Sequence, residues 1–372
     1  MKTSQHQGAG SLAEQQQEPI HAVIMAGGQG QRFWPLSTAE RPKQFLDLSR
    51  SGRTLIQQTY DRVLPLAHSP ERVFVATAER YLDLVHEQLP DVPLENVLVE
   101  PTPRDSAPAI ALASLNIHQR FGDVVTGFFS SDHQIGSGFD NAILAAARVA
   151  RERDGLVTVG ITPSRPSTGY GYIELGNPQG EGFRVSRFVE KPNVRSAEAY
   201  LAAGNYLWNA GIFVWRTGVV LAELDRHAPE LMRPLRSSFA AGTVVSDFAK
   251  LQKISIDYAL MERTERAYVV PGRFSWDDIG DWVALERLVG SQGGTTSSNT
   301  VVGHHVGVDT SGNIVYTEDP EDVVVTLGVH DLVIVKRGNA LLLVHKERVQ
   351  EIKTLLEDER LAQLLAKQNG GS

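Results

Sequence analysis

Short apolar runs alternate with amphipathic stretches through the first half of the chain. Residues 21–26 form a continuous apolar run that ends in glycines, which is typical of a buried parallel strand. Residues 55–66 are apolar at helical spacing and predict a helix. The alternation continues with strands predicted over 72–76, 96–99 and 124–129, and with helices predicted over 81–89 and from Ser106. This order predicts βαβ units and a mostly parallel sheet that is covered on both faces.

The second half of the chain is richer in β-branched residues. Residues 156–215 predict mainly strands, with a hairpin or loop at Gly-Tyr-Gly-Tyr 169–172, and helices follow near 217–226 and 255–263. A Gly/Ser/Thr stretch over 290–300 predicts a linker. Beyond it, short β-branched runs recur about every ten residues, which indicates a meander or a small stacked β-coil; they lie at 300–302, 313–316, 323–325, 332–335 and 341–344.

The two ends of the chain differ in character. Residues 1–19 are polar and predict a disordered tail or a cloning remnant. At the other end an apolar stripe predicts a helix that packs on its own domain or on a second subunit, so we expect a homodimer; the stripe comprises Val349, Ile352, Leu356, Leu361, Leu364 and Leu365. The predicted organisation is a tail over 1–19, a catalytic α/β domain over 20–290 and an assembly region over 291–372.

Composition narrows the function classes. The chain has 372 residues and no cysteine, which excludes disulfides, thiolate zinc sites and cysteine catalysis. Its 36 Lys and Arg against 44 Asp and Glu give a net charge of −8, so we expect no nucleic-acid partner. No apolar run is long enough to span a membrane, and the N-terminal tail lacks the apolar core of a signal peptide. We therefore expect a cytoplasmic protein without a membrane partner.

A glycine-rich loop follows the first predicted strand. Its backbone, at Ala26, Gly27, Gly28 and Gly30, can approach a phosphate or a base closely, although a tight turn would also use these glycines. The loop is neither a P-loop, because no Gly-Lys-Ser/Thr follows, nor a full dinucleotide fingerprint, because Phe33 replaces the third glycine. A nicotinamide-dependent oxidoreductase would need that third glycine and also an acidic residue at the end of the second strand. Residues 72–77 read RVFVAT and contain no acidic residue, so the sequence argues against this class of enzyme.

Cations and a carboxylate accompany this loop. Arg32 and Lys43 lie within about a dozen residues of the glycines, and two such cations suit a polyanion such as a triphosphate. Each alone would read as a solvated surface charge. Asp132 follows the strand predicted over 124–129, near the sheet edge where open α/β folds bind ligands. A helix N-cap or an Asx-turn is the alternative interpretation of Asp132.

Several motifs in order carry a family resemblance. The segment from Gly27 to Ser37, followed by Arg-Pro-Lys-Gln-Phe at 41–45, resembles the signature of sugar-1-phosphate nucleotidyltransferases. Within that family it is similar to the mannose-1-phosphate guanylyltransferase (GDP-mannose pyrophosphorylase) branch. Further motifs extend the resemblance from about residue 21 to 367; they are Glu-Pro 100–101, Arg-Asp-Ser-Ala-Pro 104–108, Asp-His 132–133, Gly-Tyr-Gly-Tyr-Ile 169–173, Phe-Val-Glu-Lys-Pro 188–192, Trp-Asn-Ala-Gly 208–211, Ser-Ile-Asp-Tyr 255–258 and Trp-Asp-Asp-Ile-Gly 276–280.

The resemblance implies a fold and a reaction. The fold would be a Rossmann-like, mostly parallel α/β nucleotidyltransferase domain, followed by a small β-helix-like region and a terminal helix. The reaction would transfer GMP from GTP to mannose 1-phosphate, giving GDP-mannose and pyrophosphate. The attacking sugar phosphate is already an anion, so catalysis needs positioning and charge neutralisation rather than a general base.

The resemblance also implies roles for individual residues. Asp132 and Asp278 would hold a Mg²⁺ that bridges the phosphates, with Asp277 as the competitor at the second position. Arg32 and Lys43 would hold the departing phosphates, and Lys191 would grip the sugar phosphate. The remaining implied contacts are Ala26, Gly27, Gly28, Gly30, Arg104, Asp105 and Ser106 to the nucleotide, and Gly171, Glu190 and Asn209 to the sugar.

Two departures from the family pattern bear on the base. The family usually has Arg-Asn-Thr-Ala-Pro where this chain has Asp105 and Ser106, and Pro-Ala before Asp-His where this chain has Ser130 and Ser131. Asp105 could accept hydrogen bonds from the N1–H and N2–H₂ edge of guanine. We treat this as a hypothesis about base selection.

Other interpretations stay open at this point. A manno-heptose 1-phosphate could replace mannose 1-phosphate, and a non-catalytic regulator that binds nucleotide sugars is a second class of function. His304 and His305 lack a third ligand at sensible spacing and favour a surface or turn role over a metal site. Longer family members carry an additional isomerase domain after the β region, and a chain of 372 residues has no room for one. We therefore expect a single activity.

Overall fold

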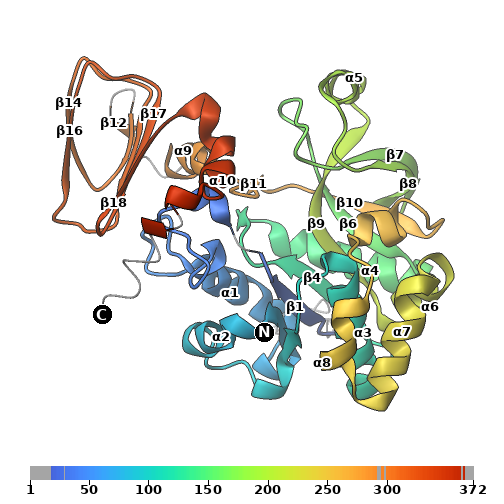
Figure 1. Cartoon of the computed structure of the whole chain (residues 1–372). Coiled ribbons are helices and arrows are strands. Elements are labelled where there is room, and N and C mark those ends of the chain that lie inside the picture. The colour runs from blue at the N-terminus through green and yellow to red at the C-terminus, as the bar shows by residue number, and fades with distance from the viewer. Residues whose placement is uncertain (1–17, 29, 291–294, 297–298, 362, 365–372) are drawn as a thin grey trace, which may run out of the picture.

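The computed structural model describes residues 18–28, 30–290, 295–296, 299–361 and 363–364. Most of the predicted N-terminal tail and part of the predicted linker therefore lie outside the described residues. A large α/β body and a smaller β body stand side by side, with helix α9 (Trp282–Gly290) at their junction (Figure 1). Within the described ranges, no helix is both long and apolar enough to cross a membrane.

A nine-stranded sheet forms the centre of the large body, in the order β3-β2-β1-β4-β9-β6-β10-β8-β7. Strand β1 (His21–Ala26) runs parallel to both neighbours, β2 (Val73–Ala78) and β4 (Val125–Ser130). The sheet is mixed, because β9 (Tyr206–Arg216) is antiparallel to β4 and to β6 (Leu156–Ile161). The other strands are β3 (Val97–Glu100), β7 (Tyr172–Gln179), β8 (Gly182–Val189) and β10 (Ala267–Gly272).

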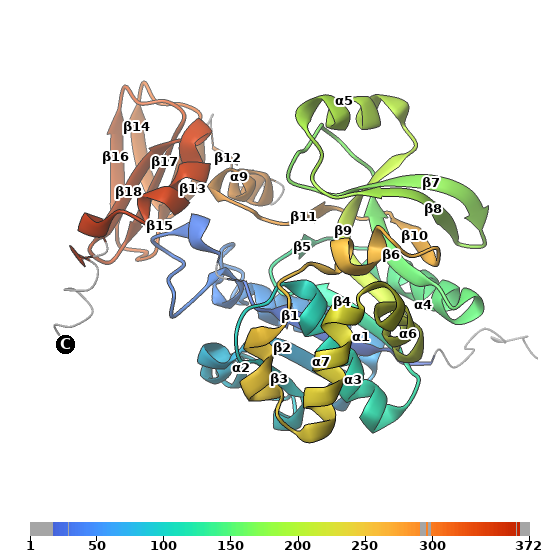
Figure 2. The same ribbon diagram turned by 45° about the vertical axis from the view of Figure 1, so that its right-hand side comes forward.

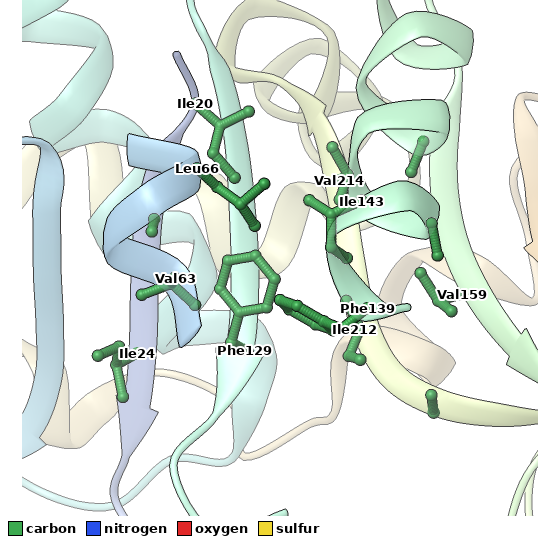
Figure 3. Close-up of a cluster of buried hydrophobic side chains, with 14 of the residues drawn as sticks. Ile20, Ile24, Val63, Leu66, Phe129, Phe139, Ile143, Val159, Ile212 and Val214 are labelled. Carbon is green, nitrogen blue, oxygen red and sulfur yellow. The ribbon is translucent and has the colours of Figure 1, made fainter. Parts of the chain in front are cut away.

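Helices cover both faces of this sheet, as the alternation of elements predicts. On one face, Val63 of α1 (Leu55–Ala67) and Ile143 of α4 (Phe139–Arg153) pack with Phe129 of β4 (Figure 3). The opposite face packs against α3 (Ser106–Phe121), α6 (Thr217–His227) and α7 (Pro229–Ala241). The shorter helices are α2 (Leu82–Gln88), α5 (Val194–Ala203) and α8 (Val244–Asp247), and the helix predicted near 255–263 is a π-helix over Asp257–Met261.

The smaller body is a stacked β-coil, as the ten-residue spacing predicts (Figure 2). On one side β13 (Asn299–Val302), β15 (Ile314–Thr317) and β17 (Leu332–Arg337) pair in parallel, and β18 (Ala340–His345) closes the edge antiparallel to β17. On the other side β14 (His304–Val308) pairs in parallel with β16 (Val323–Leu327). His304 and His305 lie in a strand rather than a turn, but the exposure of His304 agrees with the predicted surface role, and the His305 ring forms a hydrogen bond with the Thr326 hydroxyl at 2.8 Å.

The two bodies share a hydrophobic core. Phe33 and Leu36, from the segment after β1, cluster with Trp282 of α9 and with Ile314 and Val333 of the β-coil. The signature segment is therefore held partly by the C-terminal body, although the predicted domain boundary lies near residue 290.

The terminal apolar stripe is only partly buried. Val349 of the 3₁₀ helix Lys346–Glu351 and Ile352 of α10 (Ile352–Leu355) join the shared core, whereas Leu364 is exposed. Leu365 lies outside the described residues. A larger exposed apolar face occurs on β14 and β16, where five side chains are 59–74% exposed: Val306, Val308, Val323, Val325 and Leu327.

Candidate active site

The predicted site residues gather at one edge of the large sheet. The glycine loop follows the carboxyl end of β1, and Asp132 follows the carboxyl end of the parallel neighbour β4. A short antiparallel pairing of β5 (Gln134–Ile135) with β11 (Trp276–Asp277) then places Asp278 beside this edge. The sheet topology thus brings together two carboxylates that are far apart in sequence.

Lys43 lies between these carboxylate-bearing segments. Its Nζ is 2.7 Å from Asp132 Oδ2 and donates to the main-chain oxygens of Asp278 and Ile279, both at 2.8 Å. The lysine side chain is only 5% exposed, so these three acceptors take the place of water. Lys43 therefore ties the signature segment to both carboxylate-bearing segments.

The glycine loop packs directly against the segment that carries Lys43. Gly30 has a φ of +56°, and a side chain there would overlap the Cβ of Lys43, so only glycine fits without strain. The Gln44 amide donates to the carbonyls of Ala26 and Gly28 at 3.1 and 2.9 Å. These two hydrogen bonds from Gln44 stabilise the backbone of the glycine loop.

The Asp132 carboxylate is held in its ionised form. Burial by itself would raise the pKa of Asp132, but the charge of Lys43, that of His133 and neighbouring hydrogen bonds outweigh burial and lower the pKa to about 2. The Ser130 hydroxyl donates one of those bonds to Oδ1 at 2.5 Å. Ser130, one of the two departures from the family pattern, thus acts directly on this carboxylate.

The neighbouring aspartates 277 and 278 have different surroundings. The Asp277 carboxylate accepts from the Ile279 amide at 2.8 Å and pairs with Arg287 of α9 at 2.7 Å, so both of its oxygens have partners within the chain. Among the described residues, the one side-chain donor to the Asp278 carboxylate is the Tyr170 hydroxyl, at 2.9 Å. This difference supports Asp278 as the residue that faces the site. The Arg32 guanidinium donates to the nearby Gly280 carbonyl at 3.3 Å and is otherwise exposed.

The donor set fits a hard divalent cation bound partly by its substrate. Asp132 and Asp278 offer carboxylate oxygens, which Mg²⁺ prefers, and Mg²⁺ commonly takes one or two carboxylates plus phosphate oxygens. Among the described residues, no group of three or more His, Cys, Asp or Glu is arranged to hold a metal ion. Asp132 and Asp278 are thus candidate ligands for such a cation.

The residues predicted to contact the sugar form a second cluster. Gly171 lies where a Cβ would come within 2.5 Å of Glu190 Oε2, and its carbonyl accepts from the Asn209 amide at 2.9 Å. Asn209 Nδ2 in turn donates to Asp257 Oδ1 at 3.0 Å. Lys191 is exposed, with its Nζ 3.1 Å from Glu190 Oε1. The structure therefore brings all four predicted residues together.

Asp257 adds a half-buried carboxyl group that the sequence analysis did not single out. Desolvation and the charge of Glu190 raise the pKa of Asp257 to about 7. Asp257 lies in the Ser-Ile-Asp-Tyr motif at 255–258, so a signal was present in the sequence. The sequence could not assign a role to Asp257, because only the folded structure places its carboxyl group beside Asn209.

The residues predicted to contact the base are largely engaged in structural contacts. Arg104 donates to the Ala249 carbonyl, and the Asp105 carboxylate caps α3 by accepting from the Ser106 amide at 2.8 Å. The Ser106 hydroxyl accepts from the Ile256 amide at 2.8 Å. These contacts hold the segment together and leave the Asp105 carboxylate partly occupied.

A different carboxyl group lies against the glycine loop. Glu100, at the end of β3, is 7% exposed, and its Oε1 lies 3.5 Å from the position that a Cβ on Gly27 would take. Desolvation and the neighbouring charge of Asp105 raise the pKa of Glu100 to about 7. No residue within the described ranges hydrogen-bonds to this carboxyl group. The Glu-Pro motif marked the position in the sequence, but not its closeness to Gly27.

Comparisons with known families place both bodies. Residues 21–290 match the nucleotidyl transferase family model, and residues 303–358 match the MannoseP isomerase/GMP-like beta-helix domain model. The chain is 37% identical over 361 residues to a mannose-1-phosphate guanylyltransferase of Escherichia coli (strain K12), covering 92% of this chain and 73% of that protein. It is also 37% identical to a mannose-1-phosphate guanylyltransferase of Klebsiella pneumoniae, covering 90% and 73% respectively.

A solved structure agrees with this placement. The Thermus thermophilus protein described as a mannose-1-phosphate geranyltransferase superposes with a TM-score of 0.84 at 36% identity. The match covers 93% of this chain and all of that one, so it includes both the α/β body and the β-coil.

Proposed function

The chain belongs to the mannose-1-phosphate guanylyltransferase family of nucleotidyltransferases, and from this premise we propose that it transfers GMP from GTP to mannose 1-phosphate at the sheet edge described above. The observation that carries the assignment to this site is the contact of Lys43 with both the Asp132 carboxylate and the Asp278 main chain. It joins the glycine loop and the two candidate metal-binding segments in one place, next to the cluster around Asn209.

The nucleotide would lie over the glycine loop. Gly28 has nothing within 4 Å of the position that a Cβ would take, which leaves room for the α- and β-phosphates, and Arg32 is exposed beside the loop to meet the outer phosphates. Lys43 already has three acceptors, so its first role is to hold Asp132 and the 278–279 segment in place. Its positive charge would also stabilise the negative charge that develops on the leaving pyrophosphate.

Asp132 and Asp278 would hold the divalent metal, which we propose is Mg²⁺. When bound, Mg²⁺ would neutralise charge on the phosphate oxygens of the nucleotide. The low pKa of Asp132 keeps its carboxylate available as a ligand across the physiological range. The Tyr170 hydroxyl orients the Asp278 carboxylate by its hydrogen bond to Oδ1.

The chemistry then requires positioning more than proton transfer. An oxygen of the sugar phosphate forms a bond to the α-phosphorus, and the bond from that phosphorus to the bridging oxygen of pyrophosphate breaks. The electron pair leaves with pyrophosphate, and no proton is consumed. Lys191 would orient the sugar phosphate, and Glu190 and Asn209 would accept and donate hydrogen bonds to sugar hydroxyls.

We assign the selection of guanine to Glu100 in preference to Asp105. The Glu100 carboxyl is buried against Gly27 and is free of hydrogen bonds from described residues, whereas Asp105 caps α3. An ionised carboxylate can accept from both N1–H and N2–H₂ of guanine, and adenine presents no such pair of donors on that edge. Guanine binding would also offset the cost of ionising a buried carboxyl group.

A homodimer is the assembly that we propose, formed through the exposed face of β14 and β16. Five large apolar side chains gather there on one two-stranded sheet. Contiguous apolar surface of this kind marks association sites in soluble proteins. The partner would be a second copy of this chain.

The test of the proposed function is release of pyrophosphate with Mg²⁺, using four nucleoside triphosphates crossed with mannose, glucose and manno-heptose 1-phosphates. We expect turnover with GTP and mannose 1-phosphate. Turnover with only another sugar 1-phosphate would change the assigned sugar substrate but would leave the location of the active site unchanged. Folded protein that is silent with every pair would contradict the enzyme assignment and favour a nucleotide-sugar-binding regulator.

A further inference from the structure

A polar cavity lies between the signature segment and the β-coil. Its volume is about 310 Å³, and three guanidinium groups line it: Arg41, Arg50 and Arg337. The rest of its wall consists of the apolar and aromatic side chains Leu36, Phe45, Leu46 and Tyr316, and of the polar side chains Asp47, Thr54 and Glu318. A cavity of this size is at the lower end of the range that binds small molecules.

Arg337 and Arg50 connect the two bodies across this cavity. Arg337 Nη1 donates to the Pro35 and Leu36 carbonyls at 3.0 and 2.7 Å. Arg50 Nη2 donates to the Thr317 carbonyl and, at 3.3 Å, to the Glu318 carbonyl. Each guanidinium has five N–H groups, so both keep donors that these carbonyls do not use.

Two carboxylates line the cavity beside the three arginines, so they offset only part of its positive charge. Glu318 pairs with Arg337 at 3.1 Å, and the Asp47 carboxylate is turned toward the backbone amides of Ser51 and Gly52. Arg41 makes one long hydrogen bond, from Nε to the Phe45 carbonyl at 3.4 Å. Within the described part of the chain, no carboxylate pairs with Arg41 or Arg50.

We propose that this cavity binds a small molecule that carries a phosphate group. Guanidinium groups match tetrahedral oxyanions because each can donate two parallel hydrogen bonds, and three of them line a single space here. The apolar wall suits the carbon body of a phosphate ester, and inorganic phosphate shares the same charged group. The site is distinct from the one proposed for the nucleotide and does not depend on that assignment.

Binding there would act on the signature segment. Arg41 lies two residues before Lys43, and Arg337 holds the carbonyls of Pro35 and Leu36. An anion that bridges Arg41 to Arg50 and Arg337 would fasten residues 35–43 to the β-coil. We therefore expect the bound anion to raise the thermal stability of the protein.

The experiment titrates inorganic phosphate against the melting temperature of the full chain, at constant ionic strength set with sodium chloride. We expect the melting temperature to rise with phosphate concentration and to reach a plateau. The apparent Kd for phosphate should be at least tenfold higher in Arg50→Gln than in the wild-type protein. Arg53→Gln is the matched control, because Arg53 is an exposed arginine that pairs with Asp61 outside the cavity. Arg32→Gln tests the nucleotide site, and we expect it to keep the rise. Arg50→Gln should release pyrophosphate within twofold of the wild-type rate.

Two results would overturn the proposal directly. One is a rise that survives in Arg50→Gln, and the other is a rise that Arg32→Gln abolishes, since the latter would place phosphate in the nucleotide site. If Arg50→Gln does not fold, Arg337→Lys replaces it, because lysine keeps the charge but loses the paired donors; an unchanged Kd in that variant would also overturn the proposal. A parallel titration with glycerol 3-phosphate separates the two sources of the phosphate group: tighter binding than inorganic phosphate indicates an esterified ligand, and equal binding indicates free phosphate.

Discussion

Lys43 Nζ lies 2.7 Å from Asp132 Oδ2, and this ion pair joins the glycine-loop segment to the neighbouring parallel strand. The same nitrogen donates to the main chain at Asp278 and Ile279. One buried lysine therefore sets the relative positions of the glycine loop and both candidate metal ligands. Substitutions at these positions and at their neighbours should have distinct effects on catalysis, folding and assembly.

The two adjacent aspartates should differ in their effect on catalysis. We expect Asp278→Asn to lower kcat/KM for pyrophosphate release about 100-fold or more, because it removes a proposed metal ligand. Asp277→Asn is the control: it keeps an oxygen for the Ile279 amide and loses an ion pair with Arg287, so its kcat/KM should change by less than about tenfold. Equal losses in the two variants would argue against Asp278 as the ligand.

Glycine at position 30 should be required for folding as well as for binding. Gly30→Ala places a Cβ against Lys43 at a φ of +56°, and we expect it to lower the free energy of unfolding by about 2 kcal/mol or more. Chemical denaturation would measure this loss. Gly28→Ala should cost under about 0.5 kcal/mol, because nothing lies within 4 Å of its added methyl group. A Gly30→Ala protein as stable as Gly28→Ala would refute the packing argument.

Glu100 should make the stability of the protein depend on pH. Its pKa is raised to about 7 by desolvation and by Asp105, so the folded state holds a proton that the unfolded state releases near its ordinary value of 4.5. The folded state then binds more protons between these values, and the Glu100 contribution to stability is lost as pH rises from about 4.5 to 7. The shift corresponds to about 3 kcal/mol.

Substitution of Glu100 checks this sign. We expect the free energy of unfolding of Glu100→Gln, relative to wild type, to increase across that pH window, as measured by denaturation at several pH values. Glu95→Gln, at an exposed position, is the control and should follow the wild-type curve.

The Glu100→Gln enzyme should also lose its preference for GTP over ATP, measured as the ratio of the two kcat/KM values. If Glu100→Gln keeps that preference and Asp105→Ala loses it, base selection belongs to Asp105.

The exposed face of β14 and β16 should govern assembly. Val325 is 71% exposed, and we expect Val325→Lys to convert a dimer to a monomer, because a lysine charge cannot be buried in an apolar interface without a partner. Light scattering after gel filtration measures the mass. Val194→Lys introduces the same charge at a valine that is 60% exposed on α5, and it should remain dimeric. A monomeric wild-type protein would rule out this interface.

Much of the local structure could be predicted from the sequence. The helix over residues 55–66 and the strand over 21–26 follow from side-chain spacing, because helix and strand periods are set by the backbone within a few residues. The ten-residue spacing likewise predicted the β-coil, apart from β14, where His304 and His305 interrupt the apolar pattern that marks a strand. The family could also be identified from the sequence, because each of its motifs is a short run of neighbouring residues and their order is the order along the chain.

Relations between distant segments were decided only by the tertiary structure. The sequence does not show that β9 enters the sheet antiparallel, and it therefore could not place Asn209 beside Asp257. The contact of Asp105 with the base stays a prediction, but the sequence did not show that the strand order β3-β2-β1 brings Glu100 to Gly27. Strand order in a sheet depends on the free energy of the whole packed core, which no local pattern encodes. The same reason explains why the shared core of Phe33 with the β-coil, and the arginine cavity beside it, emerged only from the folded chain.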